Sequence, residues 1–444
     1  MAVPAFLHLF LENRSPGQTV AKNTFWLFFG QLMSRLLRAV IVIAAARMLG
    51  AASWGAFSYA LGIATFLTTF SDIGVNALIT KEAARSPEAK YAYLATALIA
   101  KLGILAVLVP AVFIALPYLT NILEARLLLP ILIFVFIFDT LRELGASFAR
   151  ALENMQVEAG ALIATNIMIT VFGIMFLASF GTSISLATGY ALGSGLGLFA
   201  IIFALRTHLH HIFSHVNLRL IRPILTTAWP FGLMSLMGVI ALNTDIVMLG
   251  WMRTPEEVGY YAAAQKLIYL LYVLPGLVAA SLFPLTTRLA KNDTERAGTL
   301  ISRAVAGLFL TSLLITLGGI LLGNTIITTF FGAAYAPAIL SFQILMLTPL
   351  IVYPSILIGN TLFAYDEKKR FALFVAISAL SNTILNLLLI PPFGIAGAAA
   401  ATVLSQILTN IFIWRAMERI QPLRFFEGCR WWIRHLRPHN RNSS

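Results

Sequence analysis

The feature that most constrains the fold is a series of apolar runs, each long enough to cross a lipid bilayer. The first extends from about Thr24 to Ala46, and similar runs recur to the end of the chain, separated by short polar segments. A helix needs about 20 apolar residues to span the hydrocarbon layer. Only 11% of the residues are charged, against roughly 25% in soluble domains. The chain is therefore expected to be an all-α polytopic membrane protein.

Twelve transmembrane helices are predicted from these runs. They lie near residues 24–46, 55–78, 91–116, 127–148, 158–180, 183–206, 223–250, 258–283, 300–323, 336–363, 371–391 and 394–416. The first six form an N-lobe over 24–206, and the last six form a C-lobe over 223–416. Cytoplasmic segments are expected at 1–23, at the inter-lobe linker 207–222 and in a basic tail at 417–444.

The Lys and Arg residues are distributed very unevenly between the two sides of this scheme. Of the 31 Lys and Arg residues, 24 fall in loops or near span ends on the side of the N-terminus, three fall on the other side and four lie deeper within spans. Because Lys and Arg are retained on the cytoplasmic side, both termini are predicted to be cytoplasmic, in the cell (inner) membrane. The net charge of +13 then reflects topology, and nucleic acid is not an expected partner.

Short motifs recur in the two halves in the same order. Phe29-Gly30 reappears as Phe231-Gly232, and Met48-Leu49-Gly50 reappears as Met248-Leu249-Gly250. Asn166, late in the first half, has a counterpart in Asn382. Six helices per half, repeated in the same orientation, imply two lobes related by an axis along the membrane normal, as in transporters.

Two of the four basic residues within spans, Arg35 and Arg38, lie in the first run. Each costs roughly 2.5–3.5 kcal/mol at the centre of a spanning helix. Arg35 is about 17 Å from Thr24 along the helix axis, near the bilayer midplane, and Arg38 at i+3 shares its face. Two guanidinium groups on one face repel each other unless an anion lies between them. Phosphate or diphosphate suits their paired N–H donors best.

A structural role for this arginine pair is the alternative reading. A nearby carboxylate would then neutralise the arginines permanently, and the cluster would only hold helices together. The carboxylates that could do so are Asp72, Asp139, Glu143 and Asp245. Among them, Asp139 and Glu143 share a helical face with Arg142, so an intrahelical ion pair is expected there.

The other polar residues within spans also leave two readings open. Lys266, beside Gln265, is expected to assist in binding the anion from the second lobe, or else to extend its amine to the interface. Gln265, Lys101 and Asp72 are possible cavity or ion-coupling residues. Alternatively, Lys101 pairs with Asp72, or Asp72 pairs with a loop cation.

A carboxylate in the seventh predicted span could serve transport directly. Asp245, close to Asn243, could bind H⁺ or Na⁺ and so couple transport to an ion gradient, or it could be a permanent partner of Lys266.

The order of several motifs resembles a known transporter superfamily. The motifs are ARMLG (46–50), GAFSY (55–59), FSDIG (70–74), NTD (243–245) and PFGIAGAA (392–399). They are similar to the multidrug/oligosaccharidyl-lipid/polysaccharide exporter superfamily, and most of all to its polysaccharide transporters, the lipid-linked oligosaccharide or O-antigen flippases. Ser34-Arg35, followed by Ala46-Arg47 and Gly50-Ala51, also resembles the first helix of peptidoglycan-precursor flippases. Those proteins usually have fourteen spans.

The resemblance implies a flippase that moves a polyprenyl-diphosphate-linked oligosaccharide across the membrane by alternating access, for polysaccharide biosynthesis. It implies no enzymatic activity and no cofactor, with H⁺ or Na⁺ coupling as an option. The expected partners are the lipid-linked substrate, membrane lipids and other polysaccharide-assembly proteins. The alternatives are a cation-coupled multidrug antiporter of the same fold and, less favoured, a membrane polysaccharide polymerase or ligase. The basic balance of the charges within spans counts against an antiporter for organic cations.

Two further predictions concern regions outside the spans. The four histidines between residues 208 and 215 lack accompanying Cys or acidic ligands, so a solvated loop is expected there and not a metal site. In the tail, Arg430, Trp431, Trp432 and Arg434 indicate an amphipathic segment on anionic lipid.

Overall fold

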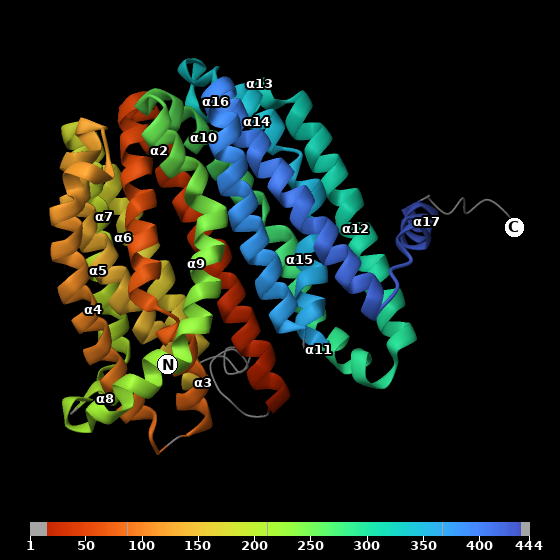
Figure 1. The fold of residues 1–444 in the computed structure, drawn as a ribbon, viewed down its shortest axis with the longest axis horizontal. Coiled ribbons are helices and arrows are strands. Elements are labelled where there is room, and N and C mark those ends of the chain that lie inside the picture. Colours follow the sequence, from red (N-terminus) through yellow and green to blue (C-terminus); the bar gives the residue numbers. More distant parts are fainter. Residues whose placement is uncertain (1–15, 87, 211, 366, 437–444) are drawn as a thin grey trace, which may run out of the picture. The chain divides into compact units, whose positions relative to one another are not determined.

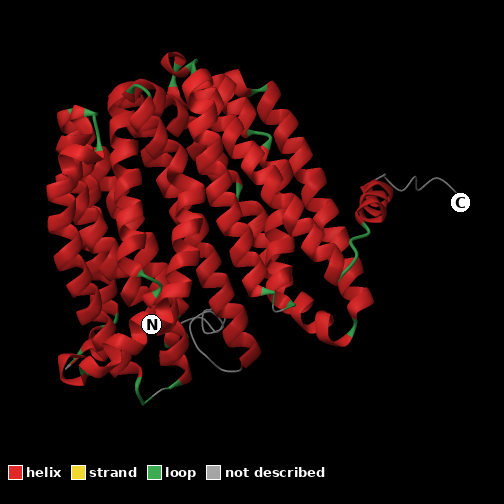
Figure 2. Cartoon of the chain, viewed as in Figure 1, coloured by secondary structure: helices red, strands yellow, loops and turns green. Residues whose placement is uncertain are grey.

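The computed structural model describes residues 16–86, 88–210, 212–365 and 367–436. Every regular element in this part of the chain is helical, as Figure 2 shows. The chain divides into two compact units, unit 1 (Met1–Ala263) and unit 2 (Ala264–Ser444). The boundary lies within α10 (Pro255–Leu271), after the predicted linker, because α9 packs against helices of unit 1. The predicted lobes, which follow the internal repeat, stay a prediction.

Unit 1 is a bundle of long antiparallel helices. Its elements before α10 are α2 (Pro16–Asp72), α3 (Val75–Arg85), α4 (Lys90–Leu119), α5 (Leu123–Ala151), α6 (Met155–Phe180), α7 (Ser183–Ala204), α8 (Arg206–Leu209), η1 (Ile212–His215), η2 (Leu218–Leu220) and α9 (Ile221–Met252). Helices α6 and α7 pack along each other, and α2 packs against α5, α6 and α9 (Figure 1).

The first two predicted spans form one bent element, α2. No loop separates them; the direction changes at Gly50, whose backbone is non-helical with φ 75° and ψ 174°. This φ lies in the left-handed region that glycine adopts without steric cost. Two helical arms that meet at Gly50 therefore supply the two predicted spans.

The predicted end of the second span at residue 78 is wrong. Helix α2 ends at Asp72, and a tight turn with φ 44° at Ile73 and φ 79° at Gly74 leads into α3. A Cβ added at Gly74 would lie 2.2 Å from the carbonyl oxygen of Ala228 and 2.4 Å from the amide nitrogen of Gly232. The helix is interrupted here because the backbones of this turn and of α9 approach too closely for a side chain.

Unit 2 continues the helical pattern after α10. Its elements are α11 (Val273–Asn292), α12 (Thr294–Leu321), α13 (Gly323–Phe331), η3 (Ala333–Tyr335), α14 (Ala338–Leu345), α15 (Thr348–Ala364), α16 (Lys368–Ile420) and α17 (Phe425–Leu436). The predicted span 336–363 is divided between α14 and α15. Helix α16 bends at Gly394, with φ 57° and ψ −133°, and so supplies the last two predicted spans.

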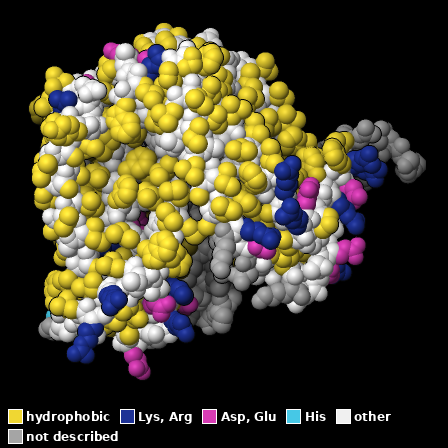
Figure 3. All heavy atoms as spheres, viewed as in Figure 1, with side chains coloured by type: hydrophobic (Ala, Val, Ile, Leu, Met, Phe, Trp, Pro, Cys, Tyr) yellow, Lys and Arg dark blue, Asp and Glu magenta, His cyan; other side chains and the backbone are white. Residues whose placement is uncertain are grey.

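The helices are suited to a membrane in length and composition. Nine helices of the described part are long and apolar enough to cross a bilayer, and two of them, Lys22–Asp72 and Arg370–Ile420, have 51 residues each and contain the glycine bends. Helix α5 is not among the nine, because charged residues flank its apolar run on both sides: Glu124 and Arg126 before it, and Asp139, Arg142 and Glu143 after it. On the face seen in Figure 3, hydrophobic side chains cover much of the helix surfaces. The chain is a multi-pass helical membrane protein, consistent with twelve spans.

The predicted orientation can be tested by labelling single cysteines. Ser214 and Glu256 are exposed residues of unit 1 that the predicted topology places in the cytoplasm and outside, respectively. The test needs a Cys429→Ser background, although burial already raises the pKa of the Cys429 thiol and so reduces its thiolate fraction. We expect an impermeant maleimide to label Glu256→Cys in intact cells and Ser214→Cys only after permeabilisation. Labelling of both positions from outside would contradict the topology.

Candidate anion-binding site

Arg35 and Arg38 lie one turn apart on the first arm of α2, and both side chains are exposed. Their charges repel each other. The Nε of Arg38 donates a hydrogen bond to Oδ1 of Asn166 on α6, at 3.2 Å. Asn166 is buried, and its own Nδ2 donates to the carbonyl oxygen of Leu162 at 2.8 Å. Both ends of the Asn166 amide are therefore engaged, and this fixes one edge of the Arg38 guanidinium.

This geometry defines which part of Arg38 can bind an anion. Its Nε is occupied by Asn166, so the two terminal nitrogens form the pair of donors that suits a phosphate oxygen edge. Sequence reasoning noted Asn166 only as a repeat position opposite Asn382. A buried amide within a span is costly unless it has a hydrogen-bond partner. This cost could have indicated that Asn166 pairs with another polar side chain.

The carboxylates of α5 are held by arginines of the same bundle. Nε of Arg142 lies 3.3 Å from Asp139 Oδ1, and its Nη2 lies 2.8 Å from Glu143 Oε1. Arg150 contacts Glu158 of α6 at 2.8 Å and Glu143 at 3.9 Å. The predicted intrahelical ion pairs are present, and they extend into a network between α5 and α6.

Asp72 and Lys101 form a second ion pair, deep in unit 1. The Nζ of Lys101 lies 2.8 Å from Asp72 Oδ1, and the Lys101 side chain is 0% exposed. The same carboxylate oxygen accepts a hydrogen bond from the backbone N–H of Asn76, at 3.1 Å. Of the partners considered for Asp72, the structure selects Lys101 and not a loop cation. This geometry favours a structural role for both residues.

The carboxylates near the two arginines of α2 have cationic partners. The four carboxylates of Asp72, Asp139, Glu143 and Glu158 face three paired cations, Lys101, Arg142 and Arg150. A favourable charge interaction joins Arg38 to Asp139. Arg35, one turn away, adds a second guanidinium of the same sign, and two neighbouring guanidinium groups favour an anion over a cation.

The remaining predicted site residues lie elsewhere. Asp245 on α9 is buried, and its Oδ2 accepts a hydrogen bond from the Tyr261 hydroxyl at 2.6 Å. Asn243 donates from Nδ2 to the carbonyl oxygen of Val239, at 3.2 Å. Gln265 and Lys266 follow the boundary within α10 and belong to unit 2, where Gln265 is buried and Lys266 is partly buried. The roles predicted for these four residues stay predictions.

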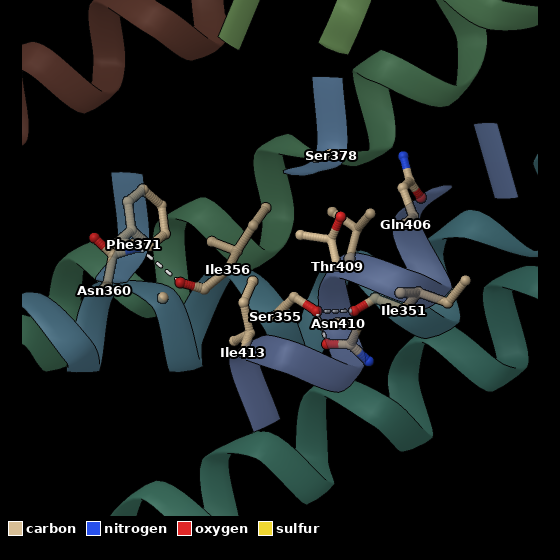
Figure 4. Close-up of a pocket in the computed structure, with 12 residues that line it drawn as sticks. Ile351, Ser355, Ile356, Asn360, Phe371, Ser378, Gln406, Thr409, Asn410 and Ile413 are labelled. Atoms are coloured by element: carbon tan, nitrogen blue, oxygen red, sulfur yellow. Dashed lines mark hydrogen bonds between the residues drawn. The ribbon is translucent and has the colours of Figure 1, made fainter. Parts of the chain in front are cut away.

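Unit 2 contains a cavity of about 260 Å³ between α15 and α16 (Figure 4). Its lining combines apolar side chains with uncharged polar ones, including Ser355, Gln406 and Asn410. The Ser355 hydroxyl lies against the Asn410 amide, while Gln406 Oε1 is buried and makes no hydrogen bond within the described part of the chain. An uncharged lining of this kind does not suit a diphosphate, so the arginines of α2 remain the candidate anion site.

Comparison with known proteins places this arrangement in a family. Residues 20–290 match the family described as "Polysaccharide biosynthesis protein". This range covers more than half of the chain and includes the whole candidate anion site. The chain belongs to the polysaccharide biosynthesis protein family.

Two relatives of this polysaccharide biosynthesis protein come from Haloferax volcanii. One, "Probable low-salt glycan biosynthesis flippase Agl15", is 26% identical over 41% of this chain and 39% of its own length. The other, "Probable flippase AglR", is 30% identical over 39% of this chain and 37% of its own length. The alignment therefore spans less than half of each relative.

A solved structure shows the same fold. The lipid II flippase MurJ, in an inward closed conformation, superimposes with a TM-score of 0.73 at 18% identity, over 91% of this chain and 89% of that chain. At this identity the likeness establishes the fold alone. The polysaccharide biosynthesis protein therefore shares the fold of that structure and carries a pair of arginines on its first long helix.

Proposed function

We propose that the protein is a flippase that moves a polyprenyl-diphosphate-linked oligosaccharide across the cell membrane. The observation that carries this proposal is the pair of exposed arginines one turn apart within a predicted span, Arg35 and Arg38, with the Arg38 guanidinium oriented by Asn166. The family match and the names of the Haloferax relatives support the same class of substrate.

In this proposal the diphosphate is the counter-ion that offsets the cost of the two arginines. Arg38, oriented by Asn166, offers its two terminal nitrogens to one phosphate edge, and Arg35 contacts the same anion one turn away. No bond of the substrate is made or broken, so the protein acts as a transporter and not as an enzyme. Alternating access then exposes the bound headgroup first to one side of the membrane and afterwards to the other.

A multidrug antiporter of the same fold is the competing function. Such a transporter binds organic cations, which two neighbouring guanidinium groups repel. The observation that would favour ion coupling in either case is Asp245, a buried carboxylate within a predicted span. We propose in addition that H⁺ or Na⁺ binds at Asp245 and couples to transport. We also propose that both termini are cytoplasmic, that the protein lies in the inner membrane, and that it contacts other polysaccharide-assembly proteins.

A reconstitution assay separates these functions. The purified full chain is placed in liposomes that contain a polyprenyl-diphosphate-linked oligosaccharide, and an impermeant glycosidase reports the fraction of headgroups on the outside. We expect the protein to accelerate equilibration of the headgroups between the leaflets, compared with protein-free liposomes. Equal rates with and without protein, combined with uptake of an organic cation, would contradict the proposal and favour the antiporter.

A further inference from the structure

A basic hollow lies on the surface of unit 2, where α17 packs against α12. It has a volume of about 360 Å³, and four arginines contribute to its lining: Arg303 of α12 and Arg424, Arg430 and Arg434 at α17. Glu427 is the acid among its lining residues, 3.9 Å from Arg424. The hollow therefore carries a net positive charge and has the chemistry of an anion site.

Specific contacts fix α17 in its position on α12. The Trp432 Nε1 donates to the carbonyl oxygen of Arg303 at 2.8 Å, and the Arg424 N–H donates to Ser302 Oγ at 3.0 Å. A Cβ added at Gly428 would lie 2.6 Å from the Ser302 carbonyl oxygen, so only glycine allows this close approach. Basic residues of a tail are often simply solvated, but here these contacts hold the arginines of α17 in a defined position beside Arg303.

The arginine of α12 marks the edge of the hydrocarbon layer. After Arg303, residues 304–321 contain no charged side chain, which corresponds to about 27 Å of helix at 1.5 Å per residue. This length matches the hydrocarbon thickness of a bilayer, about 30 Å. Arg303 therefore lies at the depth of the lipid phosphates, and Trp431, whose ring stacks 4.8 Å from its guanidinium, lies at the same level.

An apolar track leads away from Arg303 along the same face of α12. Leu314, Leu317 and Leu321 lie close to the direction of Arg303 on the helix, and all three are exposed. On α17, Phe426 and Ile433, one heptad apart, are exposed as well, although the opposite face of that helix packs on α12. A ligand that fits both features has an anionic headgroup and a long hydrocarbon chain.

We propose that the hollow between α12 and α17 binds the phosphate headgroup of an anionic membrane phospholipid, with its acyl chain along the leucine track. Arg303, Arg430 and Arg434 bind the phosphate, and the two exposed apolar side chains of α17 insert beside the acyl chain. The site holds α17 at the membrane surface and is independent of the flippase proposal, which concerns unit 1.

The test compares lipid binding by two variants that lose the same charge. The first carries Arg303→Gln, Arg430→Gln and Arg434→Gln. The control carries Arg288→Gln, Arg415→Gln and Arg419→Gln, three exposed arginines of unit 2 that do not line the hollow. Each full-length protein is titrated with phosphatidylglycerol or phosphatidylcholine in a neutral detergent, and native mass spectrometry gives the affinity.

We expect the wild-type chain to prefer phosphatidylglycerol, and the first variant to lose this affinity at least about tenfold, since each Lys or Arg near a membrane surface adds to the attraction for anionic lipid. The control variant should bind nearly as well as the wild type. Equal losses in both variants, or no loss in the first, would overturn the site. Competition by inorganic phosphate as strong as by the lipid would show a free-phosphate site and overturn the lipid assignment. Circular dichroism confirms that the variants are folded.

Discussion

Replacing Arg35 and Arg38 together by Ala is expected to reduce oligosaccharide translocation at least tenfold, while the protein remains stably inserted. Hydrogen bonds to charged groups contribute about 1.5–3 kcal/mol each, and about 1.4 kcal/mol corresponds to a tenfold change. Both side chains are exposed and Arg38 holds its partner Asn166 through a single nitrogen. Their removal should therefore affect substrate binding more than folding. The glycosidase assay in liposomes measures the rate.

Single substitutions make this test specific. Arg35→Lys keeps the charge but loses the planar fork, so the rate should fall only partly. Asn166→Leu leaves both arginines in place and should lower the rate by releasing the orientation of Arg38. A control variant with Arg219→Ala and Arg222→Ala removes the same charge from exposed positions outside the cluster and should transport normally. Wild-type transport by a stably expressed Arg35→Ala, Arg38→Ala protein would refute the role of the pair.

The protein level in the membrane separates the two readings of the arginines. If the pair only held helices together, the double variant would be lost from the membrane and its remaining molecules would transport at the normal rate. If the pair binds substrate, the level stays constant and the rate per molecule falls. Quantifying both in the same preparation therefore decides between structure and transport.

The helical class and most spans could be predicted from sequence because they depend on local hydropathy. The same holds for the ion pair between Asp139 and Arg142, which follows from i,i+3 spacing on one helix. The end of α2 at Asp72 could not be predicted in this way. It depends on the close approach of Gly74 to Gly232, which are far apart in sequence.

Long-range partners were the part of the site that spacing could not identify. Arg38 and Asn166 are separated by 128 positions, and nothing in the local sequence of either residue specifies the other. For Lys101 and Asp72, sequence reasoning could name the pair but could not choose it over a loop cation. Burial decided that question, because a fully buried ammonium needs a counter-ion within contact distance.

The buried pair of Lys101 and Asp72 should have the largest effect on stability of any ion pair in the described part of the chain. Replacing Asp72 by Leu leaves a fully buried ammonium without its counter-ion. Removing one partner of a buried pair typically costs about 3–5 kcal/mol. Thermal unfolding in detergent, and the amount of protein in the membrane, should both show a severe loss. Arg296→Ala, which breaks an exposed pair with Asp293, should cost less than about 1 kcal/mol.

Removing both charges of the buried pair should restore most of the stability. In the variant with Lys101→Met and Asp72→Leu no charge remains to be desolvated, and apolar side chains of similar volume can replace a buried pair with little net cost. A double variant as unstable as Asp72→Leu alone would contradict this account. Its transport rate has a separate meaning: a stable double variant that transports normally assigns the pair to the fold. A stable one that fails to transport assigns it to the transport cycle, as in the alternative reading of Lys101 and Asp72 as cavity or coupling residues.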